Sequence, residues 1–552
     1  MPDIGIDLGT TTTLLASAYL DNSAQLNTRI ALFPANIEGT LSTTAIRSVA
    51  YVEPGAPALV GVEAESKAKE TNDYRYFVRA IKRYMGRSVV IPHVKKSPSE
   101  ISAIYLSFII RSAFQKIGFT NNDQITITVP ASFTAAQRAD TLNALDIAAQ
   151  EFAAQFVLTP ERKQNILISE PTAALLSVIN DDLNKAPVSR RFSFDQPTKV
   201  LVYDIGGGTL DLTLATIQWR PNSAKTSIAD IDIIINDVTR YNQFGGEDFD
   251  VVVAHRVAQR LIEENPELGD RELRDDNIMQ YRVMLLEYAE QIKRDLNTKI
   301  IEAFDDSEKV IEFSTIEPIL IGGRPYSILD WQITIQDYLS WVHEYLTYQP
   351  QLKNCLHPIN LLLQRNKLQR NDVRYCIAVG GMSRFDPLQD ALRSFWGSHT
   401  QLMVPSNPDQ VVAQGAAIYS HLKRVKPQFA IIEPTADVFY VKIEHGFDIL
   451  YNQSNASDSI YKATTAQESR YLELHIFTGD GFTPPQTIRN VLHTLVPQGN
   501  LVIDMGSSQP VGTTVYIQLY FRSTDTSKVP FVKVSLNQMT NIISDTPLRT
   551  NQ

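Results

Sequence analysis

One short pattern occurs twice in this sequence, and the two copies lie 197 positions apart (201 − 4). Residues 4–12 read IGIDLGTTT, and residues 201–209 read LVYDIGGGT. In each copy an apolar run reaches an Asp and is followed by a segment rich in Gly and Thr, which predicts a strand, a tight turn and a second strand. Two copies of one structural device are therefore expected in a single chain.

Both turns have the composition of a loop that binds an anion. Backbone N–H groups of a tight turn can face a phosphate, and Gly206, Gly207 and Gly208 allow close approach because they have no Cβ. Asp7 and Asp204 end the two strands, where they would repel a phosphate unless they hold a hydrated Mg²⁺. The pattern favours a site for phosphate and magnesium. Two unrelated hairpin turns are the alternative.

Composition narrows the remaining classes of protein. The 552 residues include 61 Asp and Glu against 51 Lys and Arg, a net charge of −10, and 43% are hydrophobic. This is an ordinary globular composition, and its acidity argues against general attraction to nucleic acid or anionic lipid. Cys355 and Cys376 form no C-x-x-C, so we expect buried thiols rather than a disulfide or zinc site.

Several sequence signatures are missing. No apolar run approaches the roughly 18 residues of a membrane helix, and the first residues lack a basic leader, so we expect a cytoplasmic protein with no membrane partner. There is no G-x-x-x-x-G-K-[ST], which excludes a P-loop ATPase. No G-x-G-x-x-G opens a helix after a strand, which disfavours a dinucleotide oxidoreductase.

The texture of the chain changes near Asp437. Before about residue 420, strand-like runs alternate with helical patterns, which predicts α/β layering. After Asp437, short alternating runs predict a β-rich unit without long helices. The predicted strands are Val438 to Ile443, Tyr471 to Phe477, Val515 to Phe521 and Phe531 to Leu536. We therefore expect a first domain over 1–425, a linker over 426–436 that contains Phe429 and Glu433, and a truncated β-domain over 437–552.

Two helix starts can be predicted around the first copy of the pattern. Thr134 followed by Gln137 forms a capping box, which predicts a helix that continues to about Phe156. Glu170 precedes Pro171, which biases Glu170 away from helical backbone and places its carboxylate at the mouth of the next helix. A solvated loop Glu is the alternative for this position.

Two further elements can be predicted around the second copy. A helix over Gln280 to Asn297 carries four polar groups at i, i+3, i+4 and i+7, namely Glu290, Lys293, Arg294 and Asn297. A salt-bridged solvent face explains this spacing as well as a binding face does. After a strand over Tyr375 to Val379, we expect Asp386 to act as the N-cap of another helix, with Pro387 at its first position.

Seven segments resemble, in order, the signature blocks of the Hsp70 chaperones. They are GIDLGTTTT (5–13), FVRAIKRYMGR (77–87), ITVPASFTAAQR (127–138), SEPTAALL (169–176), VYDIGGGTLDL (202–212), FGGEDFD (244–250) and AVGGMSRFDPLQDAL (378–392). The two Asp-Gly-Thr turns alone resemble the whole actin, sugar-kinase and Hsp70 superfamily, whereas the Pro-Ala-x-Phe block, the Glu-Pro-Thr-Ala-Ala block and the lysine in AIKR are particular to Hsp70. The resemblance covers about 420 residues. It implies an α/β fold, a duplicated actin-like ATPase fold of two lobes, followed by a small antiparallel β-domain.

The resemblance implies a slow ATPase that uses ATP, ADP and Mg²⁺, with K⁺ as a further candidate ion. Lys82 would stabilise the γ-phosphoryl group and orient water. Glu170 and Asp204 would position the attacking water, and Thr209 would bond the γ-phosphate. Asp7 and Asp204 would hold Mg²⁺ through water. Catalysis would then consist of positioning and electrostatic stabilisation.

It also implies which residues hold the rest of the nucleotide. The phosphate-side candidates are Gly9, Thr10, Thr11, Thr12, Gly206, Gly207, Gly208, Gly245 and Gly246. The candidates for ribose and adenine are Glu290, Lys293, Arg294, Asn297, Gly380, Gly381, Met382, Arg384 and Asp409. Arg384 would stack on the base. The family usually has Asn at Thr12 and Ser at Asn297 and Met382, so adenine binding by stacking, and a weaker affinity, are expected.

Other departures concern the partners. Ile166 and Ser169 stand where the family commonly has a basic residue and an Asn, which puts a standard J-domain partner in doubt. About sixteen residues follow Leu536, so no helical lid is expected. An exchange factor is a further candidate partner. Three functions follow: a chaperone whose β-domain binds extended peptide at a sheet edge, a nucleotide switch that docks one folded partner, and a small-molecule kinase or filament-forming actin relative.

Overall fold

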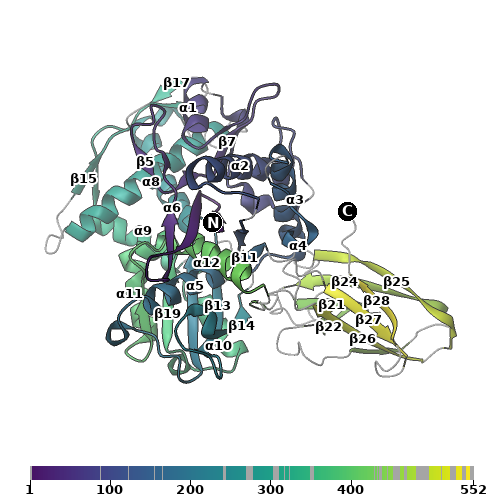
Figure 1. Ribbon diagram of the computed structural model, residues 1–552. Coiled ribbons are helices and arrows are strands. Elements are labelled where there is room, and N and C mark those ends of the chain that lie inside the picture. The colour runs from purple at the N-terminus through teal and green to yellow at the C-terminus, as the bar shows by residue number, and fades with distance from the viewer. Residues whose placement is uncertain are drawn as a thin grey trace.

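The computed structural model describes residues 3–547, apart from 72, 88, 122, 154–155, 164–165, 240–243, 269–277, 303–309, 316–317, 322–323, 348–353, 428, 430, 432, 434–437, 444–445, 452–460, 465–468, 480–495, 511–512, 522–529 and 537–541. Two α/β lobes meet around a pair of central helices, and a smaller β-domain lies to one side of them (Figure 1).

The first sheet contains the first copy of the repeated pattern. Its strands are β1 (Asp3–Leu8), β2 (Thr12–Leu20), β3 (Leu26–Ile30), β6 (Ile46–Arg47), β10 (Ile125–Val129) and β11 (Leu167–Ser169). They follow the order β11-β10-β1-β2-β3, and β6 pairs with β2. β11, β10 and β1 are parallel, whereas β2 and β3 are antiparallel to their neighbours. The sheet therefore combines an antiparallel part, β1-β2-β3, with a parallel part, β11-β10-β1.

The second sheet repeats that arrangement. Its strands are β12 (Thr198–Ile205), β13 (Leu210–Trp219), β14 (Ile231–Val238), β19 (Tyr375–Val379) and β20 (Gln401–Met403). The order β20-β19-β12-β13-β14 has the same succession of parallel and antiparallel pairs. Leu8 pairs with Thr13, and Ile205 pairs with Leu210, so residues 9–12 and 206–209 form equivalent turns. The predicted duplicated fold is confirmed.

Two helices fill the space between the sheets: α5 (Glu170–Leu183) and α12 (Val411–Val425). α12 packs on the first sheet, α5 on the second, and the two helices pack on each other. The outer helices of the first lobe are α2 (Pro98–Ser112), α3 (Ala135–Glu151) and α4 (Pro160–Lys163). Those of the second are α6 (Gly246–Glu264), α8 (Ile278–Glu302), α9 (Ile335–Thr347), α10 (His357–Arg365) and α11 (Asp386–Trp396). Each sheet is therefore covered on both faces.

Shorter elements extend the lobes on either side of the cleft between them. The short helix is α1 (Val62–Thr71), and the single turns are η1 (Tyr74–Tyr76), η2 (Ile81–Tyr84), η3 (Ala113–Ile117), η4 (Pro187–Ser189), η5 (Ile228–Asp230), η6 (Pro266–Leu268), η8 (Arg370–Asp372) and η9 (Gly381–Arg384). The short strands are β4 (Phe33–Pro34), β5 (Ser42–Thr43), β7 (Val49–Tyr51), β8 (Leu59–Val60), β9 (Phe77–Arg79), β15 (Val310–Phe313), β16 (Ile319–Ile321), β17 (Arg324–Tyr326) and β18 (Trp331–Thr334).

The C-terminal unit is antiparallel throughout its described strands. These are β21 (Val438–Ile443), β22 (Gly446–Tyr451), β23 (Tyr461–Thr464), β24 (Ser469–Gly479), β25 (Val496–Gln509), β26 (Thr514–Phe521), β27 (Pro530–Ser535) and β28 (Ile542–Pro547). The sheets β22-β21-β24-β25 and β23-β26-β27-β28 share one core, to which Ile476 and Ile517 both belong. The four predicted strands are confirmed within two residues. The sequence prediction missed β22, β23, β25 and β28.

Some predicted helix boundaries were wrong. The capping box of Thr134 and Gln137 is present, but α3 ends at Glu151, and Phe152 turns into the core against Phe114. Glu170 was predicted to lie outside the helix, but Ser169 is the N-cap of α5 and Glu170 is its first residue. Pro171 is tolerated next to it, because the N–H groups of the first helical turn have no intrahelical partner and the missing N–H of proline costs no hydrogen bond.

The helices of the second lobe differ from their predictions in a similar way. Asp386 is the first residue of α11 rather than its N-cap, because Phe385 takes that place and donates to the Met382 carbonyl of η9. α8 is longer than predicted at both ends. Cys355 and Cys376 are buried free thiols, as expected. In the described part of the chain, no helix is both long and apolar enough to cross a membrane.

Candidate functional site

A cleft with a volume of about 950 Å³ opens between the two lobes. Pockets for small molecules have volumes of roughly 300–1,000 Å³, so this one is large enough for a nucleotide. The turns 9–12 and 206–209 lie at its base, and α8 and residues 380–384 line it further out. Every residue that the sequence placed in the site lines this cleft except Gly245, whose N–H donates to the Asp248 carboxylate beside the second turn.

Acidic side chains meet at the base of the cleft. Asp7 and Asp204 are the penultimate residues of β1 and β12, and Glu170 begins α5, so the duplicated fold and α5 bring them together. The Lys82 ammonium donates to the Glu170 carboxylate, and both side chains are buried. Asp7 accepts a hydrogen bond of 2.8 Å from the Thr128 hydroxyl. Several carboxylates therefore share the single ammonium of Lys82.

This crowding shifts the pKa values of the buried groups. Burial, with the neighbouring Glu170, raises the pKa of Asp7 to about 7, although Lys82 and Thr128 oppose the shift. Burial and Glu170 also raise the pKa of Asp204 well above its usual value. Burial alone would lower the pKa of Lys82, but the charges of Glu170 and Asp7 raise it. The base of the cleft thus holds more carboxyl groups than the charge of Lys82 can keep ionised.

The residues at the base fit a magnesium ion. Asp211 lies opposite Asp204 in the hairpin, and burial raises its pKa to about 6. One of its oxygens accepts from the Ser132 hydroxyl at 2.6 Å, while the other is buried with no hydrogen-bond partner among the described residues. No group of three or more potential metal ligands was found among those residues. Excess carboxylate charge with few direct ligands suits Mg²⁺, which keeps several waters and binds phosphate oxygens.

The second turn is supported by the helix that follows it. The Gly206 N–H donates to the Thr209 carbonyl at 3.0 Å, which closes the turn. The carbonyls of Gly206 and Gly207 accept from the N–H groups of Gly246 and Glu247 at the start of α6, at 3.0 and 2.6 Å. The second turn and the start of α6 are therefore hydrogen-bonded to each other, although they are about 40 residues apart in the sequence.

The predicted adenosine residues of α8 are engaged in ion pairs. Glu290 lies 3.1 Å from Arg47 of the first lobe and 2.6 Å from Arg294. Burial opposes ionisation of Glu290, but the two guanidinium groups lower its pKa overall. Lys293 lies 2.5 Å from Asp250. The face that carries Asn297 lines the cleft, and a ligand there would meet an ordered row of charges.

The opposite wall is formed by the turn after β19. Gly380 has φ of +83°, and a Cβ there would meet the Ile205 carbonyl, so glycine is required. Met382 is buried, and a Cβ at Gly246 would lie 2.9 Å from its Cγ, so an apolar side chain fills this part of the wall. Arg384 is about half exposed and pairs with Asp409 at 2.5 Å. A planar base could lie against this exposed guanidinium.

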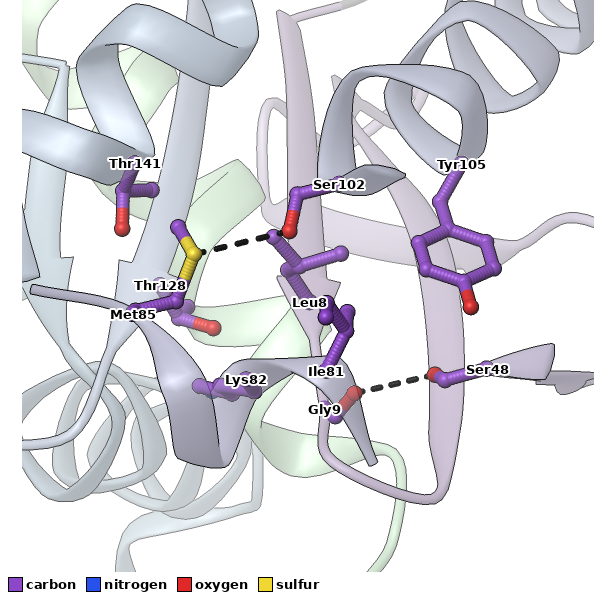
Figure 2. Close-up of a pocket in the computed structure, with 10 residues that line it drawn as sticks. All are labelled: Leu8, Gly9, Ser48, Ile81, Lys82, Met85, Ser102, Tyr105, Thr128 and Thr141. Carbon is purple, nitrogen blue, oxygen red and sulfur yellow. Dashed lines mark hydrogen bonds between the residues drawn. The ribbon is translucent and has the colours of Figure 1, made fainter. Parts of the chain in front are cut away.

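Behind Lys82 there is a second, much smaller cavity (Figure 2). Its volume of about 10 Å³ corresponds to roughly one water molecule. The Ser48 hydroxyl donates to the Gly9 carbonyl at 2.9 Å on one side, and the Ser102 hydroxyl lies 3.6 Å from the Met85 sulfur on the other. Lys82 therefore lines both the cleft and this small cavity.

The segment after α12 contacts the start of α5. The Glu433 carboxylate accepts from the hydroxyls of Ser169 and Thr172, the latter at 2.5 Å, and from the Ser169 N–H at 3.3 Å. Phe429 is buried against Tyr419 of α12. Ala430, Ile432 and Pro434 of the predicted linker lie outside the described residues. Glu433 thus binds the two residues that flank Glu170 and Pro171.

Several residues of the site were missed by sequence reasoning, among them Asp211, Thr128, Arg47 and Glu247. Asp211 could have been found, because a four-residue turn places it opposite Asp204. Thr128, which bonds Asp7, lies on the neighbouring strand β10. Arg47 and Glu247 act across the cleft, to Glu290 and to Thr11, over separations of more than 200 residues. No local signal identifies such contacts.

Comparison with known proteins yields one family. The family described as "Hsp70 protein" matches residues 88–465. A protein named "Chaperone protein DnaK" from Thermotoga neapolitana is 31% identical over 417 residues, 75% of this chain and 58% of that protein. A protein of the same name from Thermosipho melanesiensis is 28% identical over 488 residues, 86% of this chain and 70% of that protein. The match therefore spans little more than half of the first relative.

Proposed function

The chain belongs to the Hsp70 family, and on this premise we propose that it is an ATP-dependent molecular chaperone. ATP·Mg²⁺ binds in the cleft and is hydrolysed slowly to ADP and phosphate. The state of the nucleotide changes how the C-terminal β-domain holds a peptide or protein client. An exchange factor acts on the nucleotide-bound lobes.

The observation that carries this proposal is the meeting of the two equivalent turns beside one buried acidic cluster. Backbone and hydroxyl groups of 9–12 and 206–209 bind the β- and γ-phosphates. Asp7 and Asp204 would hold Mg²⁺, which when bound would supply positive charge beside the phosphates. The residues of Glu290 to Asn297 on α8 bind ribose and adenine, and Arg384 stacks on the base.

The protein's part in hydrolysis is to position and to stabilise charge. Lys82 exchanges its contact with Glu170 for one with the γ-phosphoryl group when ATP is bound. Glu170, released from that ion pair, accepts a hydrogen bond from the attacking water together with Asp204. The hydroxyl of Thr209 donates to the γ-phosphate. None of these groups forms a covalent bond to the substrate, which agrees with slow turnover.

Contacts of the linker support coupling between the cleft and the β-domain. Glu433 binds Ser169 and Thr172 at the first turn of α5, where Glu170 also lies. Movement of Glu170 on hydrolysis would alter the N-terminus of α5, and with it the residues that Glu433 contacts. A nucleotide can shift the balance between bound and released Glu433 only if its affinity differs between those two states. The first turn of α5, which holds both Glu170 and the contacts of Glu433, would give rise to this difference in affinity.

Three measurements on the purified full chain test the proposal. Calorimetry should show binding of ATP that depends on Mg²⁺, and a single-turnover assay should show slow release of phosphate. Affinity for a fluorescent unfolded peptide should then differ between Mg·ATP and Mg·ADP. Failure to bind ATP would contradict the proposal outright.

The same peptide experiment separates the chaperone from the alternatives. Nucleotide-dependent binding of unfolded peptide supports a chaperone. Hydrolysis without any peptide binding would instead indicate a nucleotide switch that docks one folded partner. Phosphorylation of a sugar, or sedimentation that depends on protein concentration and ATP, would favour a kinase or a filament-forming relative.

A further inference from the structure

Two neighbouring side chains of η2 reach into different lobes. Lys82 contacts Glu170 at the start of the central helix α5, and its ammonium lies 5.8 Å from the ring centre of Phe133 in the first lobe. Arg83, the next residue, contacts the second lobe. One guanidinium N–H donates to the Gly208 carbonyl of the second turn at 3.2 Å. The single turn of η2 therefore bridges the cleft.

Arg83 also pairs with acidic residues at the start of α6. The same nitrogen lies 3.1 Å from the Glu247 carboxylate and 3.9 Å from that of Asp248. Glu247 accepts in turn from the Thr11 hydroxyl of the first turn at 3.1 Å. Arg83 and Glu247 thus join η2, both turns and α6 in one cluster that spans the cleft.

Packing around Gly208 shows how closely Arg83 approaches the turn. A Cβ at Gly208 would lie 2.8 and 2.9 Å from two guanidinium nitrogens and 3.0 Å from the Thr10 methyl group. The Nε of Arg83 is buried and has no hydrogen-bond partner among the described residues. The guanidinium is therefore pressed against the turn with one donor unused, although water or an incoming acceptor could fill that place.

We propose that Arg83 is a positioning residue that couples closure of the two lobes to the placement of Lys82. When the lobes close, Gly208 and Glu247 hold Arg83, and the rigid turn of η2 then fixes Lys82 at the cleft. When the lobes open, the cluster breaks and Lys82 loses this restraint. Arg83 acts through Lys82 and the turn, and this role rests on the proposed ATPase function.

The test compares two matched substitutions in the full chain. Arg83→Ala removes the cluster, whereas Arg87→Ala removes an equal charge from the same segment, where Arg87 is exposed and lies over the ring of Tyr84. We expect Arg83→Ala to lower the single-turnover rate by about tenfold while changing the Kd of Mg·ATP by less than about threefold. Mg·ADP should dissociate several times faster. Arg87→Ala should match the unaltered chain in all three.

A second variant separates positioning from loss of structure. Glu247→Gln keeps size and shape but removes the charge that holds Arg83, so it should reproduce the slower hydrolysis. The double variant should be no slower than Arg83→Ala, because both changes break one contact. Additive effects, or an Arg83→Ala rate equal to that of Arg87→Ala, would overturn the inference while the ATPase function stands. Absence of hydrolysis by the unaltered chain would overturn both.

Discussion

Replacing Lys82 by Ala should have two separable consequences. Hydrolysis should fall by at least about tenfold, or 1.4 kcal/mol in the activation free energy, because the ammonium no longer stabilises the γ-phosphoryl group. Mg·ATP affinity should change only a few fold. The free energy of unfolding of the ligand-free chain should fall by about 3 kcal/mol, because the substitution leaves buried Glu170 without its partner.

The two effects require different assays and one compensating variant. Phosphate release from a preformed complex measures hydrolysis, and urea unfolding without nucleotide measures stability. Changing Glu170 to Gln in the Lys82→Ala chain removes the unpaired charge, so stability should recover while hydrolysis stays slow. Unchanged hydrolysis in the single variant would remove Lys82 from the mechanism. A double variant as unstable as the single one would refute the electrostatic account of the ion pair.

Two further predictions concern the acidic cluster. Asp204→Asn should weaken Mg·ATP binding more than ADP binding, since the lost charge lies where metal and γ-phosphate meet; equal losses in calorimetry would indicate a misfolded lobe instead. Asp7, with a pKa raised to about 7, is partly protonated in the metal-free chain at neutral pH. Binding of Mg·ATP should therefore release a proton and tighten from about pH 6 to 8; a binding heat independent of buffer ionisation enthalpy would contradict this.

The sequence predicted the parts of the fold that local patterns determine. The repeat alone located both hairpins, and the strand over Tyr375 to Val379 was placed correctly because it is a continuous apolar run. The capping box at Thr134 was correct as well. Helix ends were less predictable: α3 ends at Glu151 since Phe152 is drawn into the core, and no turn residue marks that point.

The candidate site likewise contains residues that local motifs predict and contacts that they do not. Motif residues such as Asp7 and Asp204 could be predicted because the strands that carry them recur with the turns. The ion pairs that tie the lobes together could not. Arg47 with Glu290, and Arg83 with Glu247, join residues whose separation along the chain exceeds 160 positions, and only packing of the two lobes brings them together.

We expect the nucleotide in the cleft to control the link to the β-domain, and this coupling can be tested directly. Its most direct test is the rate at which a protease cuts the full chain within residues 426–436, with Mg·ATP, with Mg·ADP and without nucleotide. Glu433 and Phe429 already contact the lobes, and we predict that cutting is slower with Mg·ATP than with Mg·ADP. Equal rates in all three conditions would contradict coupling between the cleft and the β-domain.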